Sequence, residues 1–526
     1  MNLIKKNTPA ILLILLTLIL SSIPKWAGYS AETEGLIFKG AFFDPQDYAV
    51  HISMMRAGML GDWSYQFRFT TEPHRAAYTR LFYVILGQFN RIIRAEPEAL
   101  FEMTRWIFGF TALAALFALI KRAFRESFWQ RIAFLLAVFG SGLGWIQLIL
   151  GWVPGPITPI DFWLIDAYVF FGIALFPHFS FVTAMLCIVL VLYFDFIEQG
   201  GWNRIALIAG FSILTQFVNP IAFVLVDTTI IVMTFTSWVN KRKVVMTQAI
   251  ALGIMGLSQI PLLVYNIHLL TFDPVWSQFT AQNETLSPPP IYYAWGFGLL
   301  WIFTVAGLVP TLREKNAVFF GMLAWIIIGF ILAYAPFAIQ RRFLHGITIP
   351  LALLSAQGLK HGARFIEGKL PFLARRAQGM VVLLTLLTTL SALSLSLGRS
   401  VFLQNHPGEF FYPASLDPAF EWLKQNATPD DFILASAPSG LLIAQKTNLR
   451  VYLGHPMETL DYTSKLSLVD SYYKGNTSPG WLDETTAHWI LLGPYEQALS
   501  GGKEIQTEGV KIAYESDDVR IYRVNP

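Results

Sequence analysis

The stretch FFDPQDYAVH, residues 42–51, places Asp44 and Asp47 just beyond the first hydrophobic segment of the chain. Pro45 suits the first turn of a helix, and Asp44 suits the cap position before it, where a side chain accepts backbone N–H bonds. Asp47 and His51 are four residues apart and therefore share one face of that helix. A separate apolar stripe follows at helical spacing: Tyr48, Ile52, Met55 and Met59.

Composition places the chain among the integral membrane proteins. Its 526 residues are 54% hydrophobic and 14% charged, and the mean hydropathy of +0.49 is too high for a soluble chain. The net charge of +3 is spread over short clusters, which argues against a nucleic-acid partner. A single cysteine, Cys187, excludes a disulfide framework and a cysteine-rich metal centre.

The apolar segments predict a polytopic, mainly α-helical protein with about eleven transmembrane helices, each near the roughly 20 residues that a bilayer requires. We expect the first to be retained as an anchor, because no small-residue cleavage site follows it. The segments are residues 8–23, 100–120, 132–150, 172–196, 204–218, 221–238, 244–267, 292–309, 317–334, 343–359 and 380–397.

Short loops predict the orientation, because Lys and Arg accumulate on the cytoplasmic side. Basic residues precede the first span and recur in alternate loops, at residues 121–131, 241–243, 313–315 and 360–376. The N-terminus is therefore expected in the cytoplasm. Arg341 and Arg342 fall in a short external loop against this bias, which indicates another use for them.

The chain is expected to divide into a membrane-embedded module, residues 1–398, and an extracytoplasmic α/β domain, residues 399–526. The module includes the first external loop, residues 24–99, with amphipathic helices. In the C-terminal domain, apolar patterns predict helices at 418–426, 440–445 and 464–473, and strands at 431–436, 451–454, 489–492 and 519–524.

Asp44, Asp47 and His51 have two interpretations. If the helix lies along the membrane surface, the three side chains project together toward a cavity beneath it. Such an arrangement suits general-base catalysis or a divalent cation such as Mg or Mn, with Asp44 as the candidate ligand. The alternative is helix capping and solvation alone, because Asp-Pro helix starts are common.

The tract resembles the first-loop acidic motif of the GT-C superfamily, polytopic glycosyltransferases that take sugar from a polyprenyl-phosphate carrier. FDP followed by a helix is similar to the corresponding tract of oligosaccharyltransferase catalytic subunits. EWLKQNATPDDFILAS, residues 421–436, is similar to the start of the C-terminal domain in many bacterial members. The chain lacks a WWDYG motif in that domain, so the resemblance does not extend to transfer onto protein asparagine.

The resemblance implies a bacterial cell-membrane enzyme that transfers a sugar from a polyprenyl-phosphate donor to an extracytoplasmic acceptor at the outer leaflet. Asp44 matches the family's base or metal-binding aspartate, whereas Asp47 is offset from the usual Asp-Glu pair. Transfer also needs positive charge for the departing phosphate. Arg341 and Arg342 are candidates, because guanidinium binds phosphate bidentately; their alternative is snorkelling toward lipid headgroups. No pattern identifies the sugar or the acceptor.

Five further residues are candidates for substrate binding, each with a structural alternative. Glu72 and His74 lie in the first external loop, where simple solvation is the alternative. Asp161 and Asp166 lie in the second external loop, where helix capping is the alternative. His178 lies at the outer part of a span, where it lines a cavity or hydrogen-bonds a neighbouring helix.

In the C-terminal domain, the tract RVYLGHPMETLDY, residues 450–462, concentrates His455, Glu458 and Asp461 near a strand end. Ligands tend to bind at strand ends in α/β layers. The tract has no metal-ligand spacing, phosphate-binding glycine loop or nucleophile elbow. Acceptor binding and plain loop structure are therefore both open.

Two other functions remain open. A transporter of a lipid-linked or small substrate would use Asp227, an acid in an apolar run, for which a hydrogen bond to Gln216 or Gln259 is the structural alternative. A non-catalytic membrane scaffold would bind a partner through its C-terminal domain and would not need the acids of the first loop.

Overall fold

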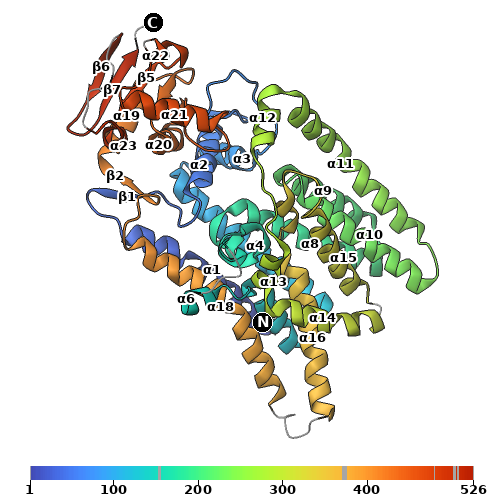
Figure 1. Ribbon diagram of the computed structural model, residues 1–526. Coiled ribbons are helices and arrows are strands. Elements are labelled where there is room, and N and C mark those ends of the chain that lie inside the picture. Colours follow the sequence, from blue (N-terminus) through green and yellow to red (C-terminus); the bar gives the residue numbers. More distant parts are fainter. Residues whose placement is uncertain are drawn as a thin grey trace. The chain divides into compact units, whose positions relative to one another are not determined.

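The computed structural model describes residues 2–151, 156–314, 316–369, 376–478, 480–501, 505 and 509–524. Lys315 and part of the expected basic loop 360–376, residues 370–375, lie outside the described residues. The chain divides into two units (Figure 1). The first comprises Met1–Pro24, Glu102–Asn266 and Glu284–Arg399, and the second comprises Lys25–Phe101, Ile267–Asn283 and Ser400–Pro526. The first loop, from residue 25 on, thus groups with the C-terminal residues.

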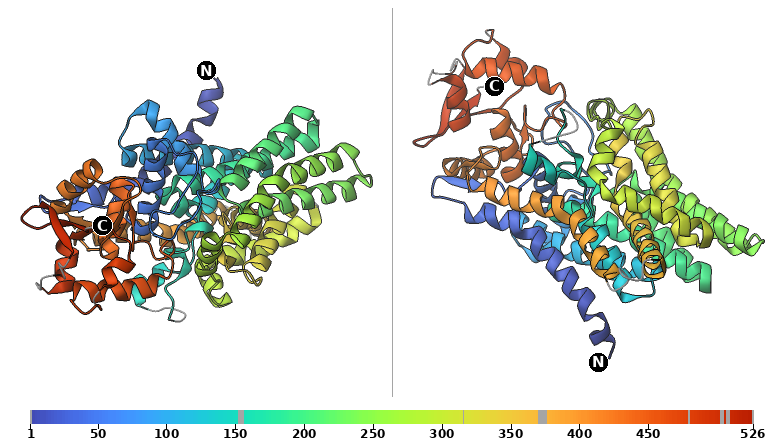
Figure 2. Two further views of the ribbon diagram at one scale, coloured as in Figure 1. Left: turned by 90° about the horizontal axis from the view of Figure 1, so that it is seen from above. Right: turned by 60° about the horizontal axis from the view of Figure 1, so that its bottom comes forward.

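The first unit is helical wherever the structure describes secondary structure. Its helices α8 and α9 pack together, as do α10 and α15, and Figure 2 shows these green and yellow helices side by side. Four helices, α1, α4, α11 and α18, have residues in both units. The elements are α1 (Asn2–Ser30), α4 (Pro97–Ala123), α5 (Ser127–Phe139), α6 (Trp145–Leu150), η1 (Ile160–Phe162), η2 (Ile165–Ala167), α7 (Val169–Leu175), α8 (Pro177–Gln199), α9 (Trp202–Val218), α10 (Ala222–Lys241), α11 (Met246–Phe272), α13 (Pro290–Phe297), α14 (Leu299–Glu314), α15 (Ala317–Leu332), η3 (Gln340–Leu344), α16 (Thr348–Lys369) and α18 (Ala377–Leu403).

The helices confirm a polytopic membrane protein, with fewer single-helix spans than the expected number. Within the described ranges, six helices are long and apolar enough to cross a membrane, and a bent pair makes a seventh if it counts as one span. Helices α5 and α15, with 13 and 16 residues, are shorter than a bilayer requires. The six are Thr8–Ser30, Pro97–Ala123, Pro177–Gln199, Ala222–Lys241, Met246–Phe272 and Ala377–Leu403.

Three of the expected spans are interrupted, and a contact or residue type accounts for each break. In 132–150 the helix stops at Phe139, and a loop follows in which Asp161 accepts backbone N–H bonds that a continuing helix would use. In 172–196 the break falls before Pro177, because a residue preceding proline disfavours helical geometry. In 292–309 the helices α13 and α14 meet at 85°, where Gly298 has a φ of 45°.

The helical part of the second unit is built on the antiparallel pair α2 (Pro45–Leu60) and α3 (Phe82–Ile93). The two helices approach closely at Gly58 and Gly87, because neither residue has a Cβ. A Cβ added at either position would overlap a backbone oxygen of the other helix. Most of α2 is buried, including Tyr48, His51 and Ser53. Helix α2 is therefore covered over most of its length by α3 and α20 (Ala437–Thr447), while Asp47 in its first turn stays partly exposed. Its expected place on the membrane surface stays a prediction.

The C-terminal part of the second unit is a five-stranded sheet with the order β4-β3-β5-β7-β6. The first three strands are parallel, and β7 and β6 continue antiparallel. All seven predicted elements are present, whereas β6, α22 and α23 of the sheet region were missed. The elements are β3 (Phe432–Leu434), β4 (Arg450–Val451), β5 (Trp489–Leu492), β6 (Val510–Glu515), β7 (Arg520–Val524), α19 (Asp417–Asn426), α21 (Tyr462–Tyr473), α22 (Trp481–Glu484) and α23 (Pro494–Ser500).

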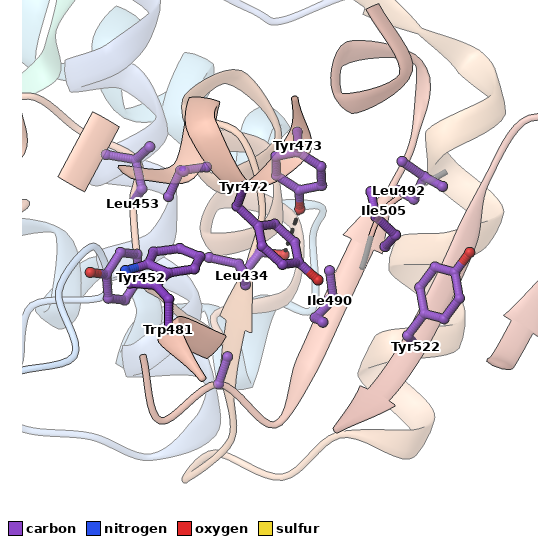
Figure 3. Packing of buried hydrophobic residues seen from close by; sticks show 12 residues of the cluster. Leu434, Tyr452, Leu453, Tyr472, Tyr473, Trp481, Ile490, Leu492, Ile505 and Tyr522 are labelled. Carbon is purple, nitrogen blue, oxygen red and sulfur yellow. Dashed lines mark hydrogen bonds between the residues drawn. The ribbon is translucent and has the colours of Figure 1, made fainter. Parts of the chain in front are cut away.

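An aromatic core lies on the sheet, with Tyr452, Tyr472 and Trp481 packed together (Figure 3). At the carboxyl ends of β3 and β5, where α/β sheets commonly bind ligands, the buried Glu496 accepts N–H bonds from Ser436 (2.9 Å) and Gly493 (3.0 Å). The protein's own carboxylate therefore fills this edge.

Three further segments join the first loop to the C-terminal residues. Strand β1 (Leu36–Phe38) pairs antiparallel with β2 (Phe411–Pro413). Arg56 of α2 donates to the carbonyl oxygen of Gln445 in α20 at 2.7 Å. Helix α12 (Pro274–Gln282) contributes Trp276, whose ring lies 4.3 Å from that of Phe67. The first loop is thus held by contacts with segments distant in sequence.

Candidate active site

Asp44 caps α2, as the sequence predicted. Its Oδ1 accepts the backbone N–H of Asp47 at 3.1 Å, and Pro45 begins the helix. The cap has a φ of 49°, a left-handed conformation that costs a non-glycine residue on the order of 1–3 kcal/mol. Such strain persists only where the surroundings fix it, and it concentrates at functional sites.

Asp44 and Asp47 form an acid pair outside the candidate spans. Burial and the charge of the neighbouring Asp47 carboxylate together raise the pKa of Asp44 to about 7. A carboxyl group with a pKa near neutrality can accept a proton in one step and release it in the next. The Asp47 side chain is 42% exposed, so the pair faces solvent on one side.

His455, from the C-terminal residues, contacts the Asp47 carboxylate of the acid pair. Its Nε2 lies 3.1 Å from Asp47 Oδ1, and its ring is only 7% exposed. Its Nδ1 accepts the backbone N–H groups of Met457 (3.1 Å) and Glu458 (3.3 Å). Burial lowers the pKa of His455, but the bond to Asp47 and the surrounding carboxylates raise it more. Because only a neutral ring accepts at Nδ1, we assign the hydrogen to Nε2.

Glu458 forms a second layer beside His455. This carboxylate is 1% exposed and receives Arg80 at 2.5 Å and the Tyr65 hydroxyl at 2.6 Å. A buried carboxylate needs such partners, because removing charge from water is costly. The Arg80 guanidinium also lies 5.7 Å from the centre of the Tyr65 ring, so this layer is fixed by packing as well as by charge.

His51 is buried in α2 and stacks on Tyr83 of α3, with ring centres 4.2 Å apart and planes 17° apart. The sequence placed it beside Asp47 on an open face. The structure uses the ring in the packing of α2 on α3, and the histidine that hydrogen-bonds Asp47 from the C-terminal residues is His455.

Glu72 and His74 lie among contacts inside the second unit. Glu72 pairs with Lys465 at 2.5 Å, and although burial opposes it, that pairing and the Thr70 hydroxyl hold the pKa of Glu72 below its usual range. The His74 ring donates from Nδ1 to the Glu72 carbonyl oxygen (2.7 Å) and accepts the Phe67 N–H at Nε2 (3.0 Å). Burial lowers the pKa of His74. Both ring nitrogens make hydrogen bonds to the backbone of the same loop.

In the first unit, Asp161 organises the loop after α5. Its Oδ2 accepts the N–H groups of Gly142 (3.2 Å) and Gly144 (3.1 Å), and burial raises its pKa to about 6. A small cavity lies beside it, lined among others by Ser141, Tyr168 and Ala392. Asp161 therefore neither caps the helical turn that follows nor faces water, the two expected alternatives, but binds the backbone of a distant loop.

Asp166 lies near His345, Arg341 and Arg342 in the first unit. His345 lies 4.0 Å away, and although burial opposes it, the contact with His345 and the charges of Arg342 and Arg341 hold the pKa of Asp166 below its usual range. The Arg341 guanidinium lies 5.0 Å from the Trp163 ring centre. The structure thus brings together an acid and two arginines that the sequence offered separately.

His178 belongs to an aromatic row near this cluster. Its ring centre is 4.3 Å from that of Phe179, which in turn stacks on His345 at 5.8 Å. His345 is buried, and its Nε2 lies 3.2 Å from the Thr183 hydroxyl. Sequence reasoning missed His345, although it follows Arg341 and Arg342 by three residues.

Asp227 contacts Gln259, whose amide donates at 2.9 Å. This is the structural alternative that the sequence offered for the acid. No group of three or more His, Cys, Asp or Glu residues is arranged to hold a metal ion among the residues that the structure describes. A metal at Asp44 stays a prediction.

His455, Glu458 and Arg80 were missed as members of the acid site. The tract 450–462 had indicated a cluster of polar residues, but nothing in the sequence related it to Asp47. The signal that could have found the link is composition: His455 and Glu458 are polar residues beside a buried strand, which requires partners from elsewhere in the fold.

Comparison with known proteins identifies the architecture. No protein-family model and no curated protein matches the chain. Among solved structures, it is similar to the Archaeoglobus fulgidus oligosaccharyltransferase tethered with an acceptor peptide, at 11% identity and a TM-score of 0.52, over 100% of this chain and 75% of that one. It is similar to ArnT from Cupriavidus metallidurans bound to undecaprenyl phosphate, at 11% identity and a TM-score of 0.50, over 99% of both chains.

A third similar structure is a mutant of the arabinofuranosyltransferase AftD from Mycobacteria, at 13% identity and a TM-score of 0.50, over 99% of this chain and 42% of that one. All three are GT-C glycosyltransferases. At these identities the likeness concerns the fold, and it extends over nearly the whole chain. The protein is an integral membrane protein with a GT-C-like fold.

Proposed function

We propose that the protein is a membrane glycosyltransferase that transfers a sugar from a polyprenyl-phosphate donor to an acceptor hydroxyl outside the cytoplasm. The observation that carries the proposal is the acid pair of Asp44 and Asp47, held by His455 at the start of α2. The fold supports it, because the similar structures are GT-C glycosyltransferases. The sugar and the acceptor are left open.

Asp44 is the proposed general base. An acceptor hydroxyl attacks the sugar carbon that bears the lipid phosphate, and its proton must leave as the new bond forms. The pKa of Asp44, raised to about 7 by burial and by Asp47, suits a base that works near neutral pH. The negative charge of Asp47 disfavours ionisation of the neighbouring Asp44 and so makes Asp44 the more basic carboxylate of the pair.

Arg341 and Arg342 are the proposed ligands of the lipid phosphate. Two guanidinium groups can bind phosphate oxygens and stabilise the charge that the leaving phosphate gains. Their charges lie near enough to the buried Asp166 to lower its pKa, and this clustering supports a shared cationic site for phosphate. ArnT, one of the similar structures, is bound to undecaprenyl phosphate, which supports a polyprenyl phosphate as the carrier here.

The proposed orientation has the N-terminus in the cytoplasm and both the first loop and the C-terminal residues outside. The basic loops of the sequence support it. Under this orientation the acid pair works at the outer leaflet of a bacterial cell membrane.

The test is transfer by the purified full-length protein in lipid nanodiscs. The donors are defined polyprenyl-phosphate sugars labelled in the sugar, and an extract of cell-envelope material supplies acceptors. We expect free polyprenyl phosphate and a labelled acceptor to appear in equal amounts with at least one donor. The same protein is also reconstituted in sealed proteoliposomes, where label that crosses the membrane on the intact lipid, without transfer to an acceptor, would indicate transport and overturn the proposal.

A further inference from the structure

The loop HPMETLD, residues 455–461, is held in place by three segments of the second unit. It follows β4, and its backbone and side chains are bound by α2, by the loop around Thr70 and by α12. Besides the bonds of His455 and Glu458, the Gln282 amide donates to the carbonyl oxygens of Met457 (2.7 Å) and Thr459 (2.9 Å). The Gln278 amide donates to the Asp461 carboxylate (3.0 Å), and the Leu460 N–H donates to the Thr70 hydroxyl (3.3 Å). The loop is therefore a rigid support.

His455 has two separable tasks in this loop. Its Nδ1 accepts the N–H groups of Met457 and Glu458 and so fixes the turn. Its Nε2 hydrogen then points at Asp47 Oδ1, 3.1 Å away. The first task belongs to the loop's own fold, whereas the second orients a side chain on another segment.

The two partners of this hydrogen bond, His455 and Asp47, differ in their exposure to solvent. The His455 ring is 7% exposed and the Asp47 side chain is 42% exposed, so the histidine lies behind the carboxylate. The other charged groups nearby have partners of their own: Glu458 binds Arg80, and Lys25 of α1 lies 5.4 Å from the ring centre of Tyr48. Burying a polar ring costs stability unless its hydrogen bonds are made. An apolar side chain would avoid that cost if the position served packing alone.

We propose that His455 is a positioning residue for the acid pair: its Nε2–H fixes the Asp47 carboxylate, and through Asp47 it holds Asp44 where the acceptor proton leaves. The C-terminal residues thereby complete a catalytic arrangement that begins in the first external loop. This inference rests on the proposed function.

Two substitutions separate the tasks of His455. His455→Asn keeps an acceptor near the place of Nδ1 but is too short to reach Asp47. His455→Gln places an amide N–H near the place of Nε2 but gives up the acceptor of the turn. His488→Asn is the matched control, because His488 Nδ1 also accepts a backbone N–H, from Phe432 at 3.0 Å, and also faces a carboxylate, Asp431, at 3.7 Å.

The measurement is steady-state transfer by the full-length variants in nanodiscs. We expect His455→Asn to lower kcat by roughly 10- to 100-fold with KM nearly unchanged, because a small displacement of a catalytic group costs up to about 100-fold. His455→Gln should keep kcat within about threefold of wild type while it lowers thermal stability. His488→Asn should leave kcat and KM unaltered.

A coupling test checks that the effect passes through Asp47. In an Asp47→Ala background, His455→Asn should lower kcat no further. An unchanged kcat in His455→Asn, a loss in Gln but not in Asn, or an equal further loss in the Asp47→Ala background would overturn the inference. Transfer that is absent from wild type overturns both proposals. Transfer that is lost in Asp44→Asn but kept in His455→Asn overturns only the role of His455.

Discussion

Replacing Asp44 by asparagine should stabilise the protein in a pH-dependent way. Asparagine caps helices about as well as aspartate, so the variant keeps the bond to the Asp47 N–H and loses only the ionisable group. Burial, with Asp47, raises the pKa of Asp44 from 3.8 to about 7. That gap is about three units, and each unit is worth about 1.4 kcal/mol. Ionised Asp44 therefore costs the folded state on the order of 4 kcal/mol.

The sign of the effect follows from the raised pKa. Below about pH 4 the carboxyl group is protonated in both the folded and the unfolded state, so wild type and variant should differ little. As the pH rises from about 4 to about 7, the unfolded state loses the proton first, and wild type loses stability that the uncharged asparagine does not lose. Above about pH 7 the difference reaches its plateau.

Thermal unfolding in nanodiscs, followed by tryptophan fluorescence between pH 4.5 and pH 9, measures this difference. A domain of 150–250 residues shifts by about 2–4 °C per kcal/mol, so we expect Asp44→Asn to melt on the order of 10 °C above wild type at pH 8. Asp273→Asn is the control, because Asp273 also caps a helix before a proline and accepts backbone N–H bonds from Val275 and Trp276. A difference that does not vary with pH refutes the reasoning.

Three further results are expected. Gly58→Ala should lower stability by about 1–3 kcal/mol and reduce transfer, because the added Cβ overlaps the Val84 carbonyl oxygen and displaces α2; Gly253→Ala, where a Cβ meets open space, is the control in the same melting and transfer assays. Glu458→Gln should lower the melting temperature by several degrees at pH 7, since breaking a buried pair costs on the order of 3 kcal/mol. Arg341→Ala should raise the KM for the donor about tenfold or more, measured as initial rates of transfer, and an unchanged KM argues against phosphate binding there.

Much of the fold followed from local patterns. The cap at Asp44, the helix after Pro45 and the seven elements of the C-terminal domain depend on propensity and on apolar periodicity within short windows. The breaks in the expected spans did not follow, because hydropathy measures transfer to lipid and not the backbone bonds that interrupt a helix. Asp161, which takes the N–H groups of Gly142 and Gly144, acts from 17 residues or more away in sequence.

Of the candidate acid site, sequence patterns selected only Asp44 and Asp47. Asp44 caps α2 and Asp47 lies in its first turn, so spacing was enough to select them. His455 lies 408 residues from Asp47, and its partner depends on how the C-terminal sheet and α2 pack. His51 was chosen because helical spacing puts it near Asp47, but packing on Tyr83 buries that side of α2. Tertiary contacts, which spacing does not encode, decided both outcomes.

The most direct test of the account is the single-turnover rate of Asp44→Asn with a saturating polyprenyl-phosphate sugar, beside Asp273→Asn. General-base catalysis contributes about 100- to 10,000-fold, so we predict that Asp44→Asn loses at least about 100-fold in rate while it stays folded and at least as stable as wild type. Asp273→Asn should react at the wild-type rate. An Asp44→Asn protein that transfers sugar as fast as wild type would contradict the assignment of the base, and with it the proposed chemistry of the acid pair.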